Sequence, residues 1–243
     1  MPPARDPGTA DTGSGISVVI PTLNEAARLP HLVGDLAALS RLREVIVADG
    51  GSIDGTPAVA AALGCRVVNG ECGRGTQLRQ GVAAATSPWL LVLHADVRLS
   101  AAALAEADTL AGTGDWRRFG SWRLRLAAPG TWLRMVENGA ALRWRLSGLA
   151  YGDQGLLVHR TLYDAAGGYP DHPIMEDVAL IQSLTQRGVP VRFSATIEAD
   201  ARRYQREGAG RRQLKNLVLV SLYLLGVSPA RLAAWYRPEP SVT

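Results

Sequence analysis

Three carboxylates of this chain stand where they could do chemistry. Asp49 follows the apolar run 45–48, Asp96 comes shortly after the run 89–93, and Asp177 opens a segment with apolar residues at helical spacing. In open α/β sheets, ligands are held just outside the carboxyl ends of the strands. A carboxylate there can accept hydrogen bonds from a base or a ribose, hold a divalent cation, or take up a proton.

The turn that begins at Asp49 holds three glycines and two aspartates, which suits the base and ribose of a nucleotide better than its phosphates. Asp54 in this turn has two interpretations, contact with the ligand or capping of the next helix. Asn24 is expected to cap a helix that begins at Glu25, which leaves Thr22 free to meet a ligand.

The motif that ends in Asp96 differs from an acid-x-acid pair in its first residue, His94. Such a pair holds a cation on a diphosphate, because Mg²⁺ and Mn²⁺ prefer oxygen ligands. His94 could donate to phosphate, serve as a nitrogen ligand that favours Mn²⁺, or be a hydrogen-bonded core residue. Glu176 and Asp177 either complement the dipole of a helix start or supply a general base. Arg74, between two glycines, either binds a base or phosphate or is an exposed loop residue.

The elements that would position these residues alternate along the first half of the chain. Apolar runs predict strands, and helical spacing predicts helices between them. The strands are expected at 16–21, 45–48, 66–68 and 89–93, and the helices at 25–39, 56–63 and 76–85. The second half predicts strands at 119–126, 156–158 and 191–193 and helices at 132–146 and 178–186. This order indicates an α/β fold with a mostly parallel central sheet.

Composition places the chain among ordinary globular proteins. It has 243 residues, 47% hydrophobic and 20% charged, and its net charge of +4 gives no support for nucleic-acid binding. Two cysteines form neither a disulfide framework nor a zinc motif, so we expect a reduced, cytoplasmic protein. Residues 1–15 predict a disordered tail without the apolar core of a signal peptide. The longest apolar stretch, 217–225, is far shorter than a membrane span.

The motifs, taken together, resemble family 2 glycosyltransferases over about residues 16–215. They include Pro21-Thr22-Leu23-Asn24-Glu25, the turn from Asp49, Gly73-Arg74-Gly75, His94-Ala95-Asp96, Glu176-Asp177 and Arg202-Arg203-Tyr204. The resemblance, which is closest to a short, single-domain bacterial subgroup, implies a GT-A fold with a Rossmann-like nucleotide-binding half fused to an acceptor-binding half. It also implies inverting transfer of a hexosyl group from a nucleotide-diphosphate sugar, with UDP the favoured nucleotide, to an acceptor hydroxyl.

Site roles follow from the resemblance by position. The nucleotide is assigned to Pro21, Thr22, Glu25, Asp49, Gly51, Asp54, Arg74 and Ala95. The Mn²⁺ or Mg²⁺ ion is assigned to Asp96 and His94, and the diphosphate to Arg202, Arg203 and Tyr204. Asp177 would deprotonate the acceptor, with Glu176 beside it. His94 departs from the acidic residue that is usual in the family. Asp153 and Gln154 are expected on the acceptor side, although a turn-forming aspartate is an equal interpretation.

Two other functions remain open at this stage. A sugar-phosphate nucleotidyltransferase would be expected to show a glycine-rich loop after the first strand, which this chain lacks, as it also lacks the G-x-G-x-x-G of dinucleotide-binding enzymes. A decayed nucleotide-binding protein is favoured by His94 alone. The acceptor class, lipid, saccharide or small metabolite, is undefined. The C-terminal helical segment 216–243 and the basic residues before it either pack on the domain or rest peripherally on a membrane.

Overall fold

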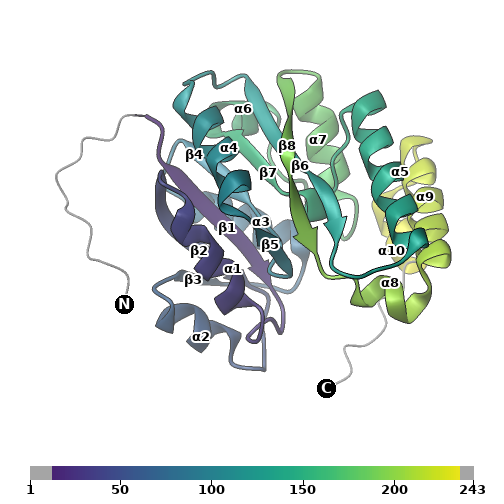
Figure 1. The fold of residues 1–243 in the computed structure, drawn as a ribbon, viewed down its shortest axis with the longest axis horizontal. Helices are drawn as coiled ribbons and strands as arrows, with labels where there is room; N and C mark the ends of the chain where they lie inside the picture. Colours follow the sequence, from purple (N-terminus) through teal and green to yellow (C-terminus); the bar gives the residue numbers. More distant parts are fainter. Residues whose placement is uncertain (1–12, 236–243) are drawn as a thin grey trace.

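The computed structural model describes residues 13–235, so the expected disordered tail 1–15 lies almost entirely outside the described residues. An eight-stranded sheet runs through the molecule in the order β3-β2-β1-β4-β7-β6-β8-β5 (Figure 1). Its strands are β1 (Ile16–Thr22), β2 (Leu42–Asp49), β3 (Arg66–Asn69), β4 (Trp89–Val92), β5 (Val97–Leu99), β6 (Arg118–Leu126), β7 (Leu156–His159) and β8 (Val189–Ala199). Four of the pairings are parallel, and β5 and β7 run antiparallel to their neighbours. The predicted α/β class and mostly parallel sheet are confirmed.

Helices cover both faces of this sheet (Figure 1). They are α1 (Leu29–Asp35), α2 (Thr56–Ala62), α3 (Arg74–Ala84), α4 (Ala101–Gly112), α5 (Thr131–Ser147), α6 (Arg160–Ala165), α7 (Glu176–Thr185), α8 (Arg202–Glu207), α9 (Ala209–Leu224) and α10 (Pro229–Trp235). The expected boundary between residues 215 and 216 lies inside α9. No helix within 13–235 is both long and apolar enough to cross a membrane.

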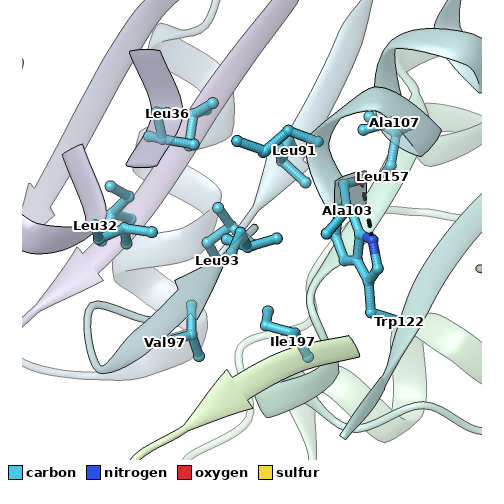
Figure 2. Packing of buried hydrophobic residues seen from close by; sticks show 14 of the residues in the cluster. Leu32, Leu36, Leu91, Leu93, Val97, Ala103, Ala107, Trp122, Leu157 and Ile197 are labelled. Atoms are coloured by element: carbon cyan, nitrogen blue, oxygen red, sulfur yellow. Dashed lines mark hydrogen bonds between the residues drawn. The ribbon is translucent and has the colours of Figure 1, made fainter. Parts of the chain in front are cut away.

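Two apolar clusters hold these layers together, one on each face of the sheet. Successive residues of β1 point to opposite faces, so Val18 belongs to one cluster and Val19 to the other. On the first face, Leu32 of α1 packs toward Leu91 of β4, and Trp122 of β6 donates a hydrogen bond from Nε1 to the Ala103 carbonyl at 3.2 Å (Figure 2). The second cluster joins α3, α6 and α7 to the sheet.

The predicted start of the helix at 25–39 is wrong. The α-helix begins at Leu29 and is followed by a 3₁₀ turn, Leu36–Ala38. Asn24 has a left-handed φ of 58° and does not cap the helix. Its Oδ1 instead accepts a hydrogen bond from Ile53 N at 2.9 Å, and its own amide donates to Ser52 Oγ. The residue that looked like a local cap therefore ties two loops that are far apart in sequence.

The second half holds elements that periodicity did not predict. Helices α4 and α6 and the short strand β5 are additional, and β8 is longer than the expected strand at 191–193. Ser100 caps α4 by accepting a hydrogen bond from Ala103 N, and serine is one of the residues preferred at this position. Strand β5 pairs antiparallel with β8 from Val97 to Leu99, so it begins directly after Asp96. This pairing fixes the position of that carboxylate.

Candidate active site

A cavity of about 510 Å³ lies where the segments after β4 and β8 meet the N-termini of α3 and α7. Its polar lining includes seven of the predicted site residues, which come from distant parts of the chain. They are Arg74, His94, Asp96, Asp153, Glu176, Asp177 and Tyr204. Tyr151, Asp200, Arg212 and Asn216 complete the polar lining, and Leu219 and Val220 contribute apolar surface. The fold thus gathers in one place both predicted catalytic residues, both predicted metal ligands and, from the predicted diphosphate group, Tyr204.

Asp177 is held rigidly at the start of α7. Its Oδ2 accepts a hydrogen bond from Gly152 N at 2.8 Å, and its Oδ1 accepts one from Val178 N at 2.8 Å. The first bond comes from the 3₁₀ turn Gly152–Gln154, which precedes β7. Because two backbone amides from different elements grip it, the carboxylate has a fixed orientation at the cavity wall. A fixed carboxylate beside a cavity is suited to accept a proton from a bound hydroxyl.

Glu176 has a different environment from its neighbour. It is 2% exposed, and its Oε1 lies 3.7 Å from Arg74 Nε. Burial and the nearby charge of Asp177 raise the pKa of Glu176 to about 7, although Arg74 acts in the opposite direction. At the same contact, Gly75 of α3 lies so close to the loop before α7 that a Cβ there would come within 2.8 Å of the Pro170 carbonyl oxygen. Glu176 therefore links the N-terminus of α3 to that of α7.

The two residues expected on the acceptor side point in different directions. Asp153 lines the cavity, and its Oδ1 atom is buried without a hydrogen-bond partner among the described residues. Burial first, and then the negative charges of Asp177 and Asp96, raise the pKa of Asp153 to about 6 against the effect of Arg143. Gln154 is buried, accepts from Arg143 and donates to the Trp122 carbonyl at 3.0 Å. It supports the turn from behind.

His94 and Asp96 both line the cavity, as the motif predicts. His94 packs against the 3₁₀ turn so closely that a Cβ at Gly152 would lie 2.5 Å from its Nε2. The Asp96 carbonyl accepts a hydrogen bond from Asp200 N at 3.2 Å, which brings a further carboxylate to the same wall. Between them, Ala95 is buried in the first apolar cluster and does not line the cavity.

The donor set fits a cation that is shared with a diphosphate. Within residues 13–235, no three His, Cys, Asp or Glu side chains lie close enough to form a metal site of their own. Mg²⁺ and similar ions are commonly bound through one or two carboxylates, with substrate phosphates and water as the remaining ligands. Asp96 meets that requirement, and the unpartnered Oδ1 of Asp153 adds an oxygen with unused acceptor capacity nearby.

Six of the eight residues assigned to the nucleotide, all except Arg74 and Ala95, form a separate cluster at the ends of β1 and β2. Asp49 is 2% exposed and accepts hydrogen bonds from Thr22 Oγ1 at 2.9 Å, Ser52 N at 2.8 Å and Gly51 N at 3.0 Å. Burial alone would raise the pKa of Asp49, but these bonds outweigh burial and lower it. The expectation that Thr22 is free is wrong, because its hydroxyl is buried against Asp49.

The loops around this nucleoside cluster are tied to one another. Asp54 Oδ1 accepts from Thr56 N at 3.0 Å, at the start of α2, and its Oδ2 accepts from Ala26 N at 3.0 Å. Asp54 is therefore not the N-cap of α2, which is Gly55, but its carboxylate binds the amide of the first residue of that helix and ties it to the loop at Ala26. Pro21 lies in β1 beside this cluster, and Gly51 has the positive φ of 90° that its turn requires.

A chain of ion pairs leads from the nucleoside cluster to the cavity. Glu25 pairs with Arg28, whose Nε lies 3.5 Å from Asp200 Oδ2. Asp200 in turn belongs to the cavity lining. None of the nucleoside-cluster residues contacts the cavity itself, but this chain joins the two halves of the expected site. The sequence had not indicated Arg28 or Asp200, although Asp200 follows a strand in the same way as Asp49.

The basic segment reaches the cavity in part. The Arg202 guanidinium binds Asp200 at 2.6 Å and is exposed, and the side chain of Arg203 lies outside the described residues. Tyr204 lines the cavity, and burial raises its pKa to about 12. Arg212, from α9, lies 5.4 Å from the Tyr204 ring and is almost fully buried at the cavity wall. In the sequence, Arg212 is only one of the basic residues that precede residue 216, so nothing there singled it out.

Part of the chain matches a known protein family. Residues 17–107 match the model described as "Glycosyl transferase family 2". This part of the chain is therefore similar to family 2 glycosyltransferases. An uncharacterized glycosyltransferase of Mycobacterium tuberculosis (strain H37Rv) is 39% identical over 140 residues, which cover 55% of this chain and 60% of that relative. A PGL/p-HBAD biosynthesis glycosyltransferase of the same strain is 39% identical over 103 residues, 39% of this chain and 38% of the relative. The chain thus spans well under two thirds of both relatives.

Two solved glycosyltransferase structures have a fold similar to that of this chain. The mannosyltransferase of Pyrobaculum calidifontis, in complex with GDP-Man and Mn²⁺, aligns with a TM-score of 0.67 at 18% identity, over 88% of this chain and 66% of that one. Glucosyl-3-phosphoglycerate synthase from Mycobacterium tuberculosis, in complex with Mn²⁺, UDP and glucosyl-3-phosphoglycerate, aligns with a TM-score of 0.55 at 21% identity, over 82% and 77%. The predicted GT-A fold is confirmed.

Proposed function

We propose that this chain is an inverting glycosyltransferase that moves a sugar from a nucleotide-diphosphate donor to an acceptor hydroxyl. The observation that carries the proposal is the single cavity shared by Asp177, Asp96, Arg74 and Arg212. It places a fixed carboxylate, a cation ligand and two cationic side chains around one space. A leaving diphosphate needs positive charge around it, and an attacking hydroxyl needs a base.

Asp177 is the general base in this proposal. Its two backbone hydrogen bonds hold the carboxylate in place while it takes the proton of the acceptor hydroxyl. The hydroxyl then attacks the anomeric carbon from the face opposite the diphosphate, and the configuration inverts in one displacement. Asp153, in the same 3₁₀ turn as Gly152, binds the acceptor or the sugar in this proposal through its Oδ1 atom, which has no hydrogen-bond partner among the described residues.

The leaving group is bound by charge. Arg74 and Arg212 approach the diphosphate from α3 and α9, and Glu176 orients Arg74 from behind. A bound Mn²⁺ or Mg²⁺ supplies a Lewis acid at the diphosphate, and Asp96, with His94 beside it, holds that ion. The complexes with UDP and GDP-Man in the related folds support a nucleotide donor, and we favour UDP.

The nucleoside binds at the cluster around Asp49 in this proposal. The strand ends there carry Thr22, Asp49 and the turn to Asp54, and the Glu25–Arg28–Asp200 pairs connect them to the cavity. The internal hydrogen bonds of Asp49 shape the turn whose backbone then meets the base and ribose. Asp49 thus acts mainly by organising the loop.

The test is product analysis with a panel of UDP-, GDP- and dTDP-sugars in the presence of Mn²⁺, without acceptor and with candidate acceptors. We expect slow release of the nucleoside diphosphate, since water can replace the acceptor, and NMR should show the inverted anomer first. Release of pyrophosphate from a sugar phosphate and a nucleoside triphosphate would instead show a nucleotidyltransferase. Tight nucleotide binding without any turnover would show a binding protein.

A further inference from the structure

Helix α9 is apolar on the side that faces solvent. Its exposed apolar residues include Leu214, Leu217, Val218 and Leu224, and Leu225, which is 81% exposed, follows directly as its C-cap. They are spaced three, one, six and one residues apart and so lie along one side of the helix. A helix that only packs on its domain exposes polar residues and buries apolar ones. Here the buried side carries Arg212, Leu219 and Val220, so both sides of α9 bear apolar residues.

Helix α5 continues this surface. Trp132, Met135, Leu142 and Leu146 are all more than half exposed. At 3.6 residues per turn these four positions lie on the same side of α5 as Gly139. Gly139 is where α5 meets α9, since a Cβ there would lie 3.9 Å from Gln213 Nε2.

Leu217 and Leu224 lie on the Gln213 side of α9 by the same helical geometry. The two helices run side by side (Figure 1). The exposed apolar residues of α5 and α9 therefore form one continuous surface, here named the α5–α9 surface. Helix α10, which packs on α9, adds a further exposed apolar side chain, Trp235, which is 63% exposed. Contiguous exposed apolar surface of this kind marks an interaction site.

The charged residues around the α5–α9 surface indicate which kind of partner it binds. Residues 208–235 contain four basic residues, Arg211, Arg212, Lys215 and Arg231, and no Asp or Glu. Arg211 and Arg231 are exposed, as is Arg145 near the C-terminal end of α5. Apolar side chains flanked by exposed arginines suit the interface of an anionic bilayer, where both groups find their preferred surroundings. A second copy of this chain, docked by the same surface, would bring these like charges together.

The α5–α9 surface also lies close to the cavity in the fold. Asn216, Leu219 and Val220 from the opposite side of α9, and Ala233 of α10, line the cavity. One helix therefore separates the proposed site of sugar transfer from the exposed apolar surface. A lipid-anchored molecule at such a surface would have its polar head within reach of the cavity mouth.

We infer that the α5–α9 surface binds the face of an anionic lipid bilayer, with α9 lying in the plane of the interface. The apolar residues enter the headgroup boundary, and Arg145, Arg211 and Arg231 bind the lipid phosphates. This inference goes beyond the proposed transfer reaction, and lipid binding can be measured without any turnover. It adds that the acceptor is delivered from the membrane surface.

The experiment is sedimentation of the full chain with vesicles of phosphatidylcholine alone or with one quarter phosphatidylglycerol, at low and at high salt. We expect binding to the anionic vesicles at low salt, at least fivefold weaker binding at high salt, and little binding to the neutral ones. Leu217→Gln/Leu225→Gln should weaken binding about tenfold, because two interfacial side chains are lost. Arg211→Gln/Arg231→Gln should also weaken it about tenfold on anionic vesicles only.

The matched control is Trp116→Gln/Val189→Gln, which removes two exposed apolar side chains away from the α5–α9 surface. It should bind as the unmodified chain does. Circular dichroism and light scattering report folding and oligomeric state for every variant. Absence of binding to anionic vesicles, or equal binding by the Leu217/Leu225 variant in its folded state, overturns the inference. A dimer that this variant abolishes, without vesicle binding, overturns it in favour of a second copy.

Discussion

Three acidic side chains in the cavity differ because their surroundings differ. The Asp177 carboxylate accepts hydrogen bonds from two backbone amides, and Glu176 is buried against Arg74. Asp153 has a carboxylate oxygen without a hydrogen-bond partner among the described residues. In the proposed reaction, these three acidic side chains thus take separate tasks, namely base, orientation of an arginine, and contact with a hydroxyl. This division rests on contacts that can be changed one at a time.

Replacement of the proposed base is the first prediction at this scale. Asp177→Asn keeps an oxygen for one of the two amide hydrogen bonds but cannot take up a proton. We expect sugar transfer to fall by about 10²–10⁴-fold, the usual contribution of a general base, with nucleotide affinity changed less than about threefold. Asp171→Asn, an exposed aspartate outside the cavity lining, is the control. Unchanged transfer in Asp177→Asn would remove the base assignment.

The buried Glu176 makes stability depend on pH. Its pKa is raised from 4.5 to about 7 by burial and by Asp177, so the folded chain keeps a proton that the unfolded chain loses above pH 4.5. The free energy of unfolding should therefore fall as the pH rises from about 4.5 to about 7. Glu176→Gln removes this loss and should be more stable than the unmodified chain at pH 8, by roughly 1–3 kcal/mol.

Urea unfolding at pH 5 and pH 8 measures this effect. Glu71→Gln, at an exposed glutamate, should leave the pH dependence of the unmodified chain in place. If Glu176→Gln showed the same fall in stability between the two pH values, Glu176 would not be the group responsible.

Many of the residues that line the cavity could be predicted from the sequence. Asp96 and Asp177 stand beside recognisable apolar segments, and Arg74 stands between glycines, so local patterns were enough. Arg212 and Asp200 could not be placed, because their position depends on how α9 and β8 pack. Thr22 was predicted to face a ligand because it follows the first apolar run. Its hydroxyl instead donates a hydrogen bond to Asp49 on the neighbouring strand, which the sequence pattern does not reveal.

At the scale of elements, the first half was predictable because its strands are continuous apolar runs in alternating order. The start of α1 was not, because Asn24 bonds to Ile53, 29 residues away, and a cap motif is recognised only by local spacing. Strand β5 was missed since three residues give too short a pattern. Its pairing with β8 nevertheless sets the position of Asp96.

The 3₁₀ turn before β7 offers a prediction at this scale. A Cβ at Gly152 would lie 2.5 Å from His94 Nε2 and 3.5 Å from Asp177 Oδ2, so Gly152→Ala must displace the turn or the histidine. Because Gly152 N also holds Asp177, we expect kcat to fall about 10–100-fold and stability by roughly 1–3 kcal/mol. The measurements are nucleoside diphosphate release and urea unfolding.

Gly34→Ala serves as the matched control for this turn. Gly34 lies in α1, and a Cβ there would meet no atom within 4 Å, so activity should persist and stability should stay equal or rise slightly. Full activity in Gly152→Ala would show that the turn does not position the base.

At the scale of the whole molecule, the sheet order brings the carboxyl ends of β1, β2 and β4 near the segments from the second half. The nucleoside cluster and the cavity are joined by the Glu25–Arg28–Asp200 pairs. The sequence predicted the α/β class and the alternation of strands and helices along the first half of the chain, but not the order of the strands in the sheet. It did not predict that α9 would form both a wall of the cavity and an exposed apolar surface, because that depends on how α9 packs against α5.

The most direct test of the central claim is calorimetric titration of nucleoside diphosphates into the chain, with and without Mn²⁺. The account predicts that Mn²⁺ tightens the binding of one of them, UDP first, at least tenfold. Asp96→Asn should abolish that gain, while Asp177→Asn should keep it. Binding of no nucleoside diphosphate, or binding that neither Mn²⁺ nor Asp96→Asn alters, would contradict a shared cavity for a cation and a diphosphate.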